Sequence, residues 1–260
     1  MSPAKVSAVI TPAFLSALRS HPHLPTHSWY FIAGVTLSAI NRPDEIPTVF
    51  NYALEHGVGP APESSKPAAA EQLQIARRLR EGLVKSAAVV GLPKQKTING
   101  LFALKTATPA ELLDEPMGYS PSARPVEVYD VPSSQILHRG QRFFDAVYGK
   151  VSKRVMGQMD RSGTEDLGVV ARLMYGYLLS NTAILSPAES SFVLMAALIP
   201  QDVNPQLKGH LKGAVNNGAT VDEVRAVRDI VIRICEASGM TRLQDNATGG
   251  WGWRSEVANL

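Results

Sequence analysis

The amino-acid sequence predicts an all-α protein, and three observations carry this prediction. Capping boxes, in which a Ser or Thr stands three residues before a Glu, mark helix starts at Ser186 and Thr220. Apolar residues recur every three to four positions through most of the chain, which is the repeat of one helix face. Only residues 126–131 remain as a strand candidate, so no sheet of any size is expected.

The first part of the chain is predicted to hold a short leading segment and a helical unit. Residues 1–27 include one short helix, and residues 28–57 then form an apolar helix and a second helix that ends at a glycine. After a Pro-rich loop, the next helix spans residues 71–90 and is stopped by a Gly-Leu-Pro sequence. A short helix over residues 99–105 completes this unit, residues 28–105.

The remaining chain is predicted to contain a connection, a second helical unit and a tail. Residues 106–137 hold several prolines and are expected to be irregular. Residues 138–243 form the second unit, which opens with a helix over residues 136–159 and closes with three well-capped helices. Residues 244–260 include a Gly-rich stretch and are predicted to be a flexible tail.

The two helical units are predicted to be copies of one repeat. When Gly57 is placed on Gly218, the apolar positions of the preceding helices coincide. The glycines that end the third helices also correspond, once a 13-residue Pro-rich insertion in the first copy is allowed for. The alignment puts Val49 opposite His210, so the first copy is predicted to be degenerate.

Composition excludes several classes of protein. Apolar residues make up 45% of the 260 residues and charged residues 19%, as in ordinary globular chains. The net charge of +3 is spread along the sequence, so nucleic acid is not an expected partner. Cys235 is the single cysteine, which excludes an intramolecular disulfide and a CxxC redox motif. No apolar run is long enough to span a membrane, and His21 and His23 lie between prolines without acidic neighbours, so no metal site is predicted.

The two ends of the chain carry weak address signals. The final tripeptide Ala258-Asn259-Leu260 resembles the SKL peroxisomal signal, although its middle residue lacks the usual positive charge. It predicts a peroxisomal location and binding to the peroxisomal import receptor. Residues 1–43 contain no Asp or Glu, which partly resembles a mitochondrial transit peptide. Mitochondrion and cytoplasm are therefore the alternative locations.

His210 and Glu189 are the residues around which chemistry is predicted. His210 lies on the same helix face as Leu207 and Leu211, which puts an imidazole on the side that faces the core. Glu189 lies in the first turn of the preceding helix, from which it reaches His210 if the two helices pack antiparallel. The alternative interpretation is a satisfied core histidine and a glutamate that only caps its helix.

The second helical unit shares a set of spaced residues with a known family. These are Leu185-Ser186, Glu189, Pro205-Gln206-Leu207, His210, Ala214, Gly218-Ala219-Thr220, Glu223-Val224 and Gly239. With this set the chain resembles the carboxymuconolactone decarboxylase and alkylhydroperoxidase D-like superfamily. The resemblance implies an all-α fold with paired copies, assembled into a homo-oligomer that is a dimer, trimer or hexamer.

The resemblance also distinguishes two kinds of chemistry. In the peroxidase branch two cysteines precede the histidine by seven and four residues, where this chain has Val203 and Gln206. Without a thiolate there is no nucleophile for peroxide reduction, so the decarboxylase branch is the nearer match. It implies a cofactor-independent lyase for a small organic acid. In such an enzyme His210 is the general acid or base, Glu189 orients it and Gln206 binds substrate.

Two rival hypotheses stay open at this point. The first is a non-catalytic oligomeric protein of an organelle matrix that keeps the fold without the reaction. The second is redox activity through Cys235, which ranks last because the chain has no resolving cysteine.

Overall fold

The computed structural model describes residues 8–59, 66–113, 122 and 124–260, and the chain in these ranges is almost entirely helical. This confirms the predicted all-α class. The α-helices are α1 Pro12–Arg19, α2 Trp29–Ala39, α3 Ile46–His56, α4 Ala69–Val90, α5 Asn99–Ala107, α6 Arg124–Tyr129, α7 Ser133–Tyr148, α8 Ser152–Asp160, α9 Asp166–Leu173, α10 Pro187–Leu198, α11 Asn204–Asn216 and α12 Val221–Ala237. None of the helices in these ranges is both long enough and apolar enough to cross a membrane.

Short elements connect these helices. Single turns of 3₁₀-helix are η1 Pro43–Glu45, η3 Ala110–Leu112, η4 Gly149–Val151 and η6 Ile199–Gln201. Two π-helical turns are η2 Lys94–Ile98 and η5 Met174–Leu179. The strands β1 Thr241–Arg242 and β2 Gly252–Trp253 form a two-residue parallel pair near the C-terminus.

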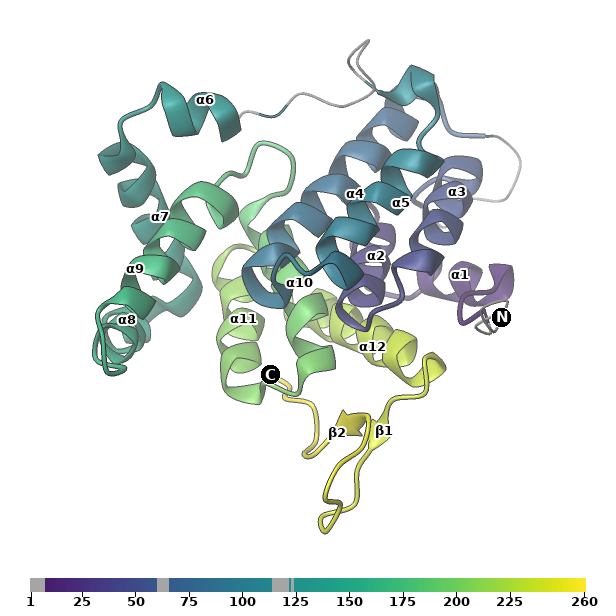
Figure 1. Cartoon of the computed structure of the whole chain (residues 1–260). Helices are drawn as coiled ribbons and strands as arrows, with labels where there is room; N and C mark the ends of the chain where they lie inside the picture. The colour runs from purple at the N-terminus through teal and green to yellow at the C-terminus, as the bar shows by residue number, and fades with distance from the viewer. Residues whose placement is uncertain (1–7, 60–65, 114–121, 123) are drawn as a thin grey trace.

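The helices α2 and α10 lie at the centre of the fold because they are apolar on every side. Every residue of α2 is buried, and so is α10 from Ser190 to Leu198. A helix without a polar face has to be surrounded by other elements. Accordingly α2 and α10 pack against each other, and α3, α4, α11 and α12 surround them (Figure 1).

These six helices follow the order that the predicted repeat requires, while the repeat itself stays a prediction. α2, α3 and α4 correspond in order to α10, α11 and α12. The first helix of each set is followed by a residue with positive φ, Asn41 at 62° and Asp202 at 56°. The second helices are followed by Gly57 and Gly218, again with positive φ. α4 packs against α10 while α12 packs against α2, so each copy completes the core of the other.

The region between the copies differs from the sequence prediction in two places. The strand candidate at residues 126–131 does not form a strand, since these residues lie mostly in α6, which buries none of its side chains. The continuous helix predicted over residues 136–159 is interrupted, because Gly149 has φ of 53°, which an α-helix does not allow. α7 therefore ends at Tyr148, and α8 starts after the turn η4. α6 to α9 lie together on one side of the molecule (Figure 1).

The segment predicted as a flexible tail, residues 244–260, has an exposed first part and buried residues in its second part. Trp253 is buried and donates a hydrogen bond from Nε1 to the carbonyl oxygen of Ile199 at 2.8 Å. Arg228 of α12 donates to the carbonyl oxygens of Val257 and Ala258 at 2.6 and 2.9 Å. Residues 248–251 are exposed. The tail is thus anchored on α12 and η6, and its flexibility stays a prediction.

Candidate functional site

His210 occupies the buried position on α11 that the sequence predicted. Its residue exposure is 4%, and Leu207, Leu211 and Ala214 on the same face are buried with it. Nδ1 of His210 has no hydrogen-bond partner among the described residues. Burial lowers the pKa of His210 from 6.5 to about 4, because an imidazolium would lose its hydration there. The imidazole is therefore neutral at pH 7.

Aromatic side chains form the surroundings of His210. The Tyr148 ring meets the imidazole edge-on, with 5.8 Å between ring centroids. Phe144 lies 4.5 Å from Tyr148 and 4.8 Å from Tyr175, again as ring centroids. Burial raises the pKa of both tyrosines, so their hydroxyls stay protonated. The site offers a neutral base and two neutral hydroxyls, without a charged group.

Close helix packing builds this aromatic site. α7 meets η5 at Gly140, where a Cβ atom would lie 2.6 Å from the backbone of Gly176. α11 meets α7 at Gly209 and Gly213, where added Cβ atoms would lie 2.7 Å from the side chains of Tyr148 and Val147. Larger residues at these positions would force the helices apart, so the glycines fix the distance between His210 and the aromatic rings.

Glu189 is engaged away from His210. It completes the predicted capping box, accepting from the backbone N–H of Ser186 at 2.9 Å. Its other carboxylate oxygen accepts a hydrogen bond from Arg78 of α4, which also donates to the hydroxyl of Tyr30 at 3.1 Å. No hydrogen bond or ion pair joins Glu189 to His210 in the described ranges, since the carboxylate faces α4 and α2. The structure does not bring the predicted acid–base pair together.

Gln206 and Cys235 do not add to the site. Gln206 is exposed in the first turn of α11, while His210 one turn later is buried. Its substrate-binding role stays a prediction. Cys235 is buried, and burial raises the pKa of its thiol, so little thiolate forms near neutral pH.

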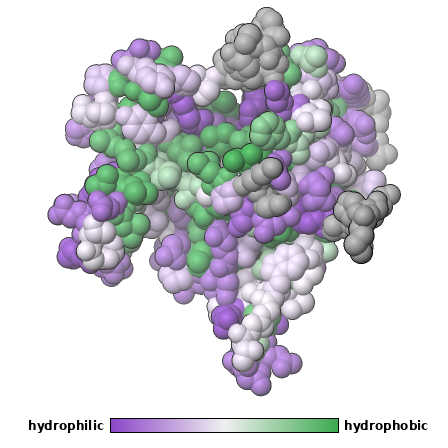
Figure 2. Space-filling model, viewed as in Figure 1, coloured by the Kyte–Doolittle hydropathy of each residue, from purple (hydrophilic) through white to green (hydrophobic). Residues whose placement is uncertain are grey.

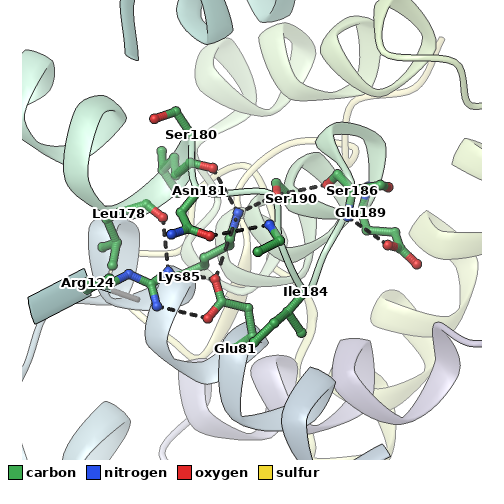
Figure 3. A network of polar contacts seen from close by, with 12 residues as sticks. Glu81, Lys85, Arg124, Leu178, Ser180, Asn181, Ile184, Ser186, Glu189 and Ser190 are labelled. Atoms are coloured by element: carbon green, nitrogen blue, oxygen red, sulfur yellow. Dashed lines mark hydrogen bonds and ion pairs between the residues drawn. The ribbon is translucent and has the colours of Figure 1, made fainter. Parts of the chain in front are cut away.

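A buried polar network between α4, α10 and η5 was missed by the sequence reasoning. Lys85 of α4 is fully buried and donates to the carbonyl oxygen of Leu179 at 2.8 Å and to Oγ of Ser190 at 2.6 Å. Oε1 of Glu81 lies 4.0 Å from its Nζ. Burial lowers the pKa of Lys85 to about 8. Figure 3 shows Lys85 at the centre of this network, with Glu81 and Arg124 on one side and Glu189 on the other.

Ion pairs from α6 and α7 extend the network. Arg124 binds Glu81 through two hydrogen bonds of 2.6 and 2.9 Å. Arg139 binds Glu127 in the same two-pronged way at 2.7 and 2.9 Å, and these hydrogen bonds lower the pKa of the Glu127 carboxyl. The first pair joins α6 to α4, and the second joins α7 to α6. The network therefore ties α6 and α7 to the central helices.

Lys85 and Ser190 have the chemistry of a base and a nucleophile but lack access. A lysine with a lowered pKa next to a serine hydroxyl resembles the Ser–Lys pairs of some hydrolases. Both residues are fully buried, and the hydrogen bonds of Lys85 are directed at protein atoms. We therefore interpret the pair as structural. The only sequence signal was a lysine on the inward side of a helix.

A metal site is not formed by the described residues. No group of three or more His, Cys, Asp or Glu side chains in these ranges lies close enough to hold a metal ion.

Comparison with known proteins identifies the family. No protein-family model matches the chain, and no solved structure matches it. Peroxisomal protein 2 of Schizosaccharomyces pombe is 39% identical over 216 residues, which cover 83% of this chain and 89% of that protein. The chain belongs to the peroxisomal protein 2 family. Peroxisomal protein 2 of Saccharomyces cerevisiae is 30% identical over 281 residues, covering 92% of this chain and 94% of the relative.

Membership of this family confirms the predicted location. The protein is peroxisomal, and the mitochondrial and cytoplasmic alternatives fall away. The name of the relatives gives a location and no reaction.

Proposed function

We propose that this peroxisomal protein is a non-catalytic oligomeric protein of the organelle matrix, in which the histidine of the fold is a core residue. One observation carries the proposal: Glu189 is held by Arg78 and by its own helix cap, while His210 has no ionisable partner. An acid–base enzyme of the predicted kind needs those two groups in contact.

The ion pair keeps Glu189 from turning toward His210. Arg78 and Glu189 expose only 9% and 17% of their side chains, so their separation would leave the guanidinium without its carboxylate in a largely dry site. Removing one partner of a buried pair costs about 3–5 kcal/mol. A swing of Glu189 toward the imidazole would meet the same penalty.

Helix α9 supports the oligomer in the proposal. Gly168 is its only buried residue, while apolar side chains on and just after it are between 38% and 49% exposed. These are Leu167, Val169, Val170, Leu173 and Met174. Together they expose on the order of 400 Å² of apolar surface, as much as the largest patch of a typical monomer. Figure 2 shows hydrophobic surface on this side of the molecule and across its centre.

Helix α6 enlarges the same side of the molecule. Val126, Val128 and Tyr129 are more than half exposed, Tyr129 at 83%. α6 and α9 both pack against α7, so their exposed residues are carried by one group of helices. Together they approach the roughly 800 Å² per partner that a stable interface buries. We therefore assign the homo-oligomer contact to α6 and α9.

The mass of the protein in solution tests this proposal. The 28.0 kDa chain should have the mass of a dimer, trimer or hexamer by light scattering after size-exclusion chromatography. The double variant Leu167→Glu/Leu173→Glu should fall to the monomer mass, because it places charge in the apolar contact. Gln158→Glu, at an exposed position of α8, is the matched control and should keep the oligomer. A monomeric wild type would contradict the proposal.

A second candidate function is acid–base chemistry by His210 alone, as the resemblance to the decarboxylase branch implies. The unpaired Nδ1 of His210 favours it, because a buried polar atom without a partner is often completed by a ligand. The test is deuterium incorporation from heavy water into a small unsaturated lactone acid. Incorporation that His210→Leu abolishes, in a variant that unfolds like wild type, would support this candidate and exclude the non-catalytic one.

A further inference from the structure

A groove between η4 and α11 combines apolar walls with two lysines. Its volume is about 490 Å³, within the range of small-molecule sites. Val151, Val215, Val221 and Leu260 line it, and each is 36–40% exposed. These four apolar side chains thus line one hollow, and each remains partly exposed to solvent. We call this hollow the η4–α11 groove.

The break in the predicted long helix creates the groove. Gly149, with φ of 53°, ends α7 and turns the chain aside, which places Lys150 and Val151 opposite α11. The amide of Asn216 donates to the carbonyl oxygen of Val147 at 3.2 Å and fastens the end of α11 to the end of α7. The walls are therefore held together by the turn at Gly149 and by the side chain of Asn216.

The charged side chains around the groove have one sign. Lys150 from η4 and Lys212 from α11 line it, and no Asp or Glu side chain does. Neither lysine forms an ion pair with any described residue. Arginines in the same ranges do form such pairs, for example Arg124 with Glu81 and Arg139 with Glu127. Two ammonium groups that form no ion pair favour an anion.

We propose that the η4–α11 groove binds an amphipathic monocarboxylate, with the alkyl chain against the valines and the carboxylate between Lys150 and Lys212. A small inorganic anion would leave the apolar walls uncovered, and a neutral apolar molecule would leave both lysines without a counter-charge. A medium-length alkyl carboxylate satisfies both parts of the groove. Covering half-exposed Val and Leu side chains adds apolar burial to the ion pair.

A second copy of the chain fits the groove less well. A two-fold symmetric contact through this surface would bring Lys150 and Lys212 of one copy near the same lysines of the other. Like charges placed together oppose such a contact. The groove also lies on different helices from the exposed row of α9, so the inference does not depend on the proposed oligomer or on catalysis.

Calorimetric titration of the full-length protein with decanoate, and with decanol as the neutral probe of equal chain length, tests the proposal. Wild type should bind decanoate more tightly than decanol. The variant Lys150→Met/Lys212→Met should lose about tenfold in decanoate affinity and keep its decanol affinity, since two half-exposed ion pairs supply about that factor. Lys208→Met, on α11 but outside the groove, is the matched control and should bind like wild type.

Further variants separate the outcomes. Val215→Glu should weaken both probes, because it puts a charge in the apolar wall; thermal unfolding checks that each variant is folded. Equal affinities of wild type for decanoate and decanol, or equal effects of the Lys208 and Lys150/Lys212 substitutions, would overturn the proposal. A third result would also overturn it: wild type binds neither probe, and Val215→Glu changes the mass of the oligomer. The groove would then be a contact between protein chains.

Discussion

Replacing Glu189 by Gln separates its structural role from a catalytic one. Gln keeps the size of the side chain and its acceptor for the N-cap, so the capping box with Ser186 survives. The substitution removes the negative charge that faces Arg78. Any loss of stability therefore reports the ion pair between α4 and α10 rather than the helix cap.

The structure gives the size of the expected loss. Removing one partner of a buried pair costs about 3–5 kcal/mol when the other charge is stranded. Arg78 retains the Tyr30 hydroxyl and the carbonyl oxygens of His27 and Ile184 as acceptors, at 3.1 to 3.3 Å. The Gln amide oxygen also remains as a neutral acceptor. We therefore expect Glu189→Gln to lower the free energy of unfolding by about 2 kcal/mol, below the full penalty.

Urea unfolding of the variant and of a matched control measures this loss. Glu223→Gln is the control, because Glu223 fills the same position in the capping box of α12 and has no basic partner among the described residues. We expect its change to stay within about 0.5 kcal/mol. A double-mutant cycle with Arg78→Met should give a coupling energy of about 1–2 kcal/mol.

Nuclear magnetic resonance of the His210 ring provides the refuting result. If Glu189 acts only on Arg78, the titration of His210 is the same in wild type and in Glu189→Gln. A changed His210 titration, or equal stability losses for the Glu189 and Glu223 variants, would refute the reasoning.

The remaining predictions concern pH, the thiol and the address signal. The folded pKa of His210, about 4, lies below the unfolded value of 6.5, so the unfolded chain binds the extra proton and stability falls as pH drops from 6.5 toward 4. His210→Leu should remove about 3 kcal/mol of this fall in pH-dependent urea unfolding. Cys235 should resist iodoacetamide in the native state and react after unfolding, measured by mass spectrometry; rapid native alkylation would revive the redox hypothesis. Removal of Ala258 to Leu260 should move a fluorescently tagged protein from peroxisomes to cytosol, and unchanged localisation would exclude this tripeptide as the signal.

Local rules were sufficient for much of the helical framework. The capping boxes at Ser186 and Thr220 are present, because a cap depends on residues only three positions apart. Gly57 and Gly218 end their helices with positive φ, as glycine allows. The helix break at Gly149 was not predicted, because the helical spacing of apolar residues continues in register on both sides of it. Spacing alone does not reveal that the backbone turns there.

Spacing was also misleading at residues 126–131, the one strand candidate. Alternation of Val126 and Val128 with polar residues is typical of a half-buried strand, but a strand also needs a partner. Here Glu127 binds Arg139, and the segment folds as a helix whose valines stay exposed. The ion pair joins residues on two successive helices, and no spacing rule would have singled it out.

The sequence by itself determined the all-α class, the positions of most helices and the burial of His210, because each depends on short-range periodicity or capping. Only the tertiary structure decided what the charged side chains contact. Glu189 meets Arg78, which lies 111 positions away, and Lys85 meets Ser190 across 105 positions. Such pairs form because α4 of the first copy packs on α10 of the second, so partner choice follows from how the copies pack together.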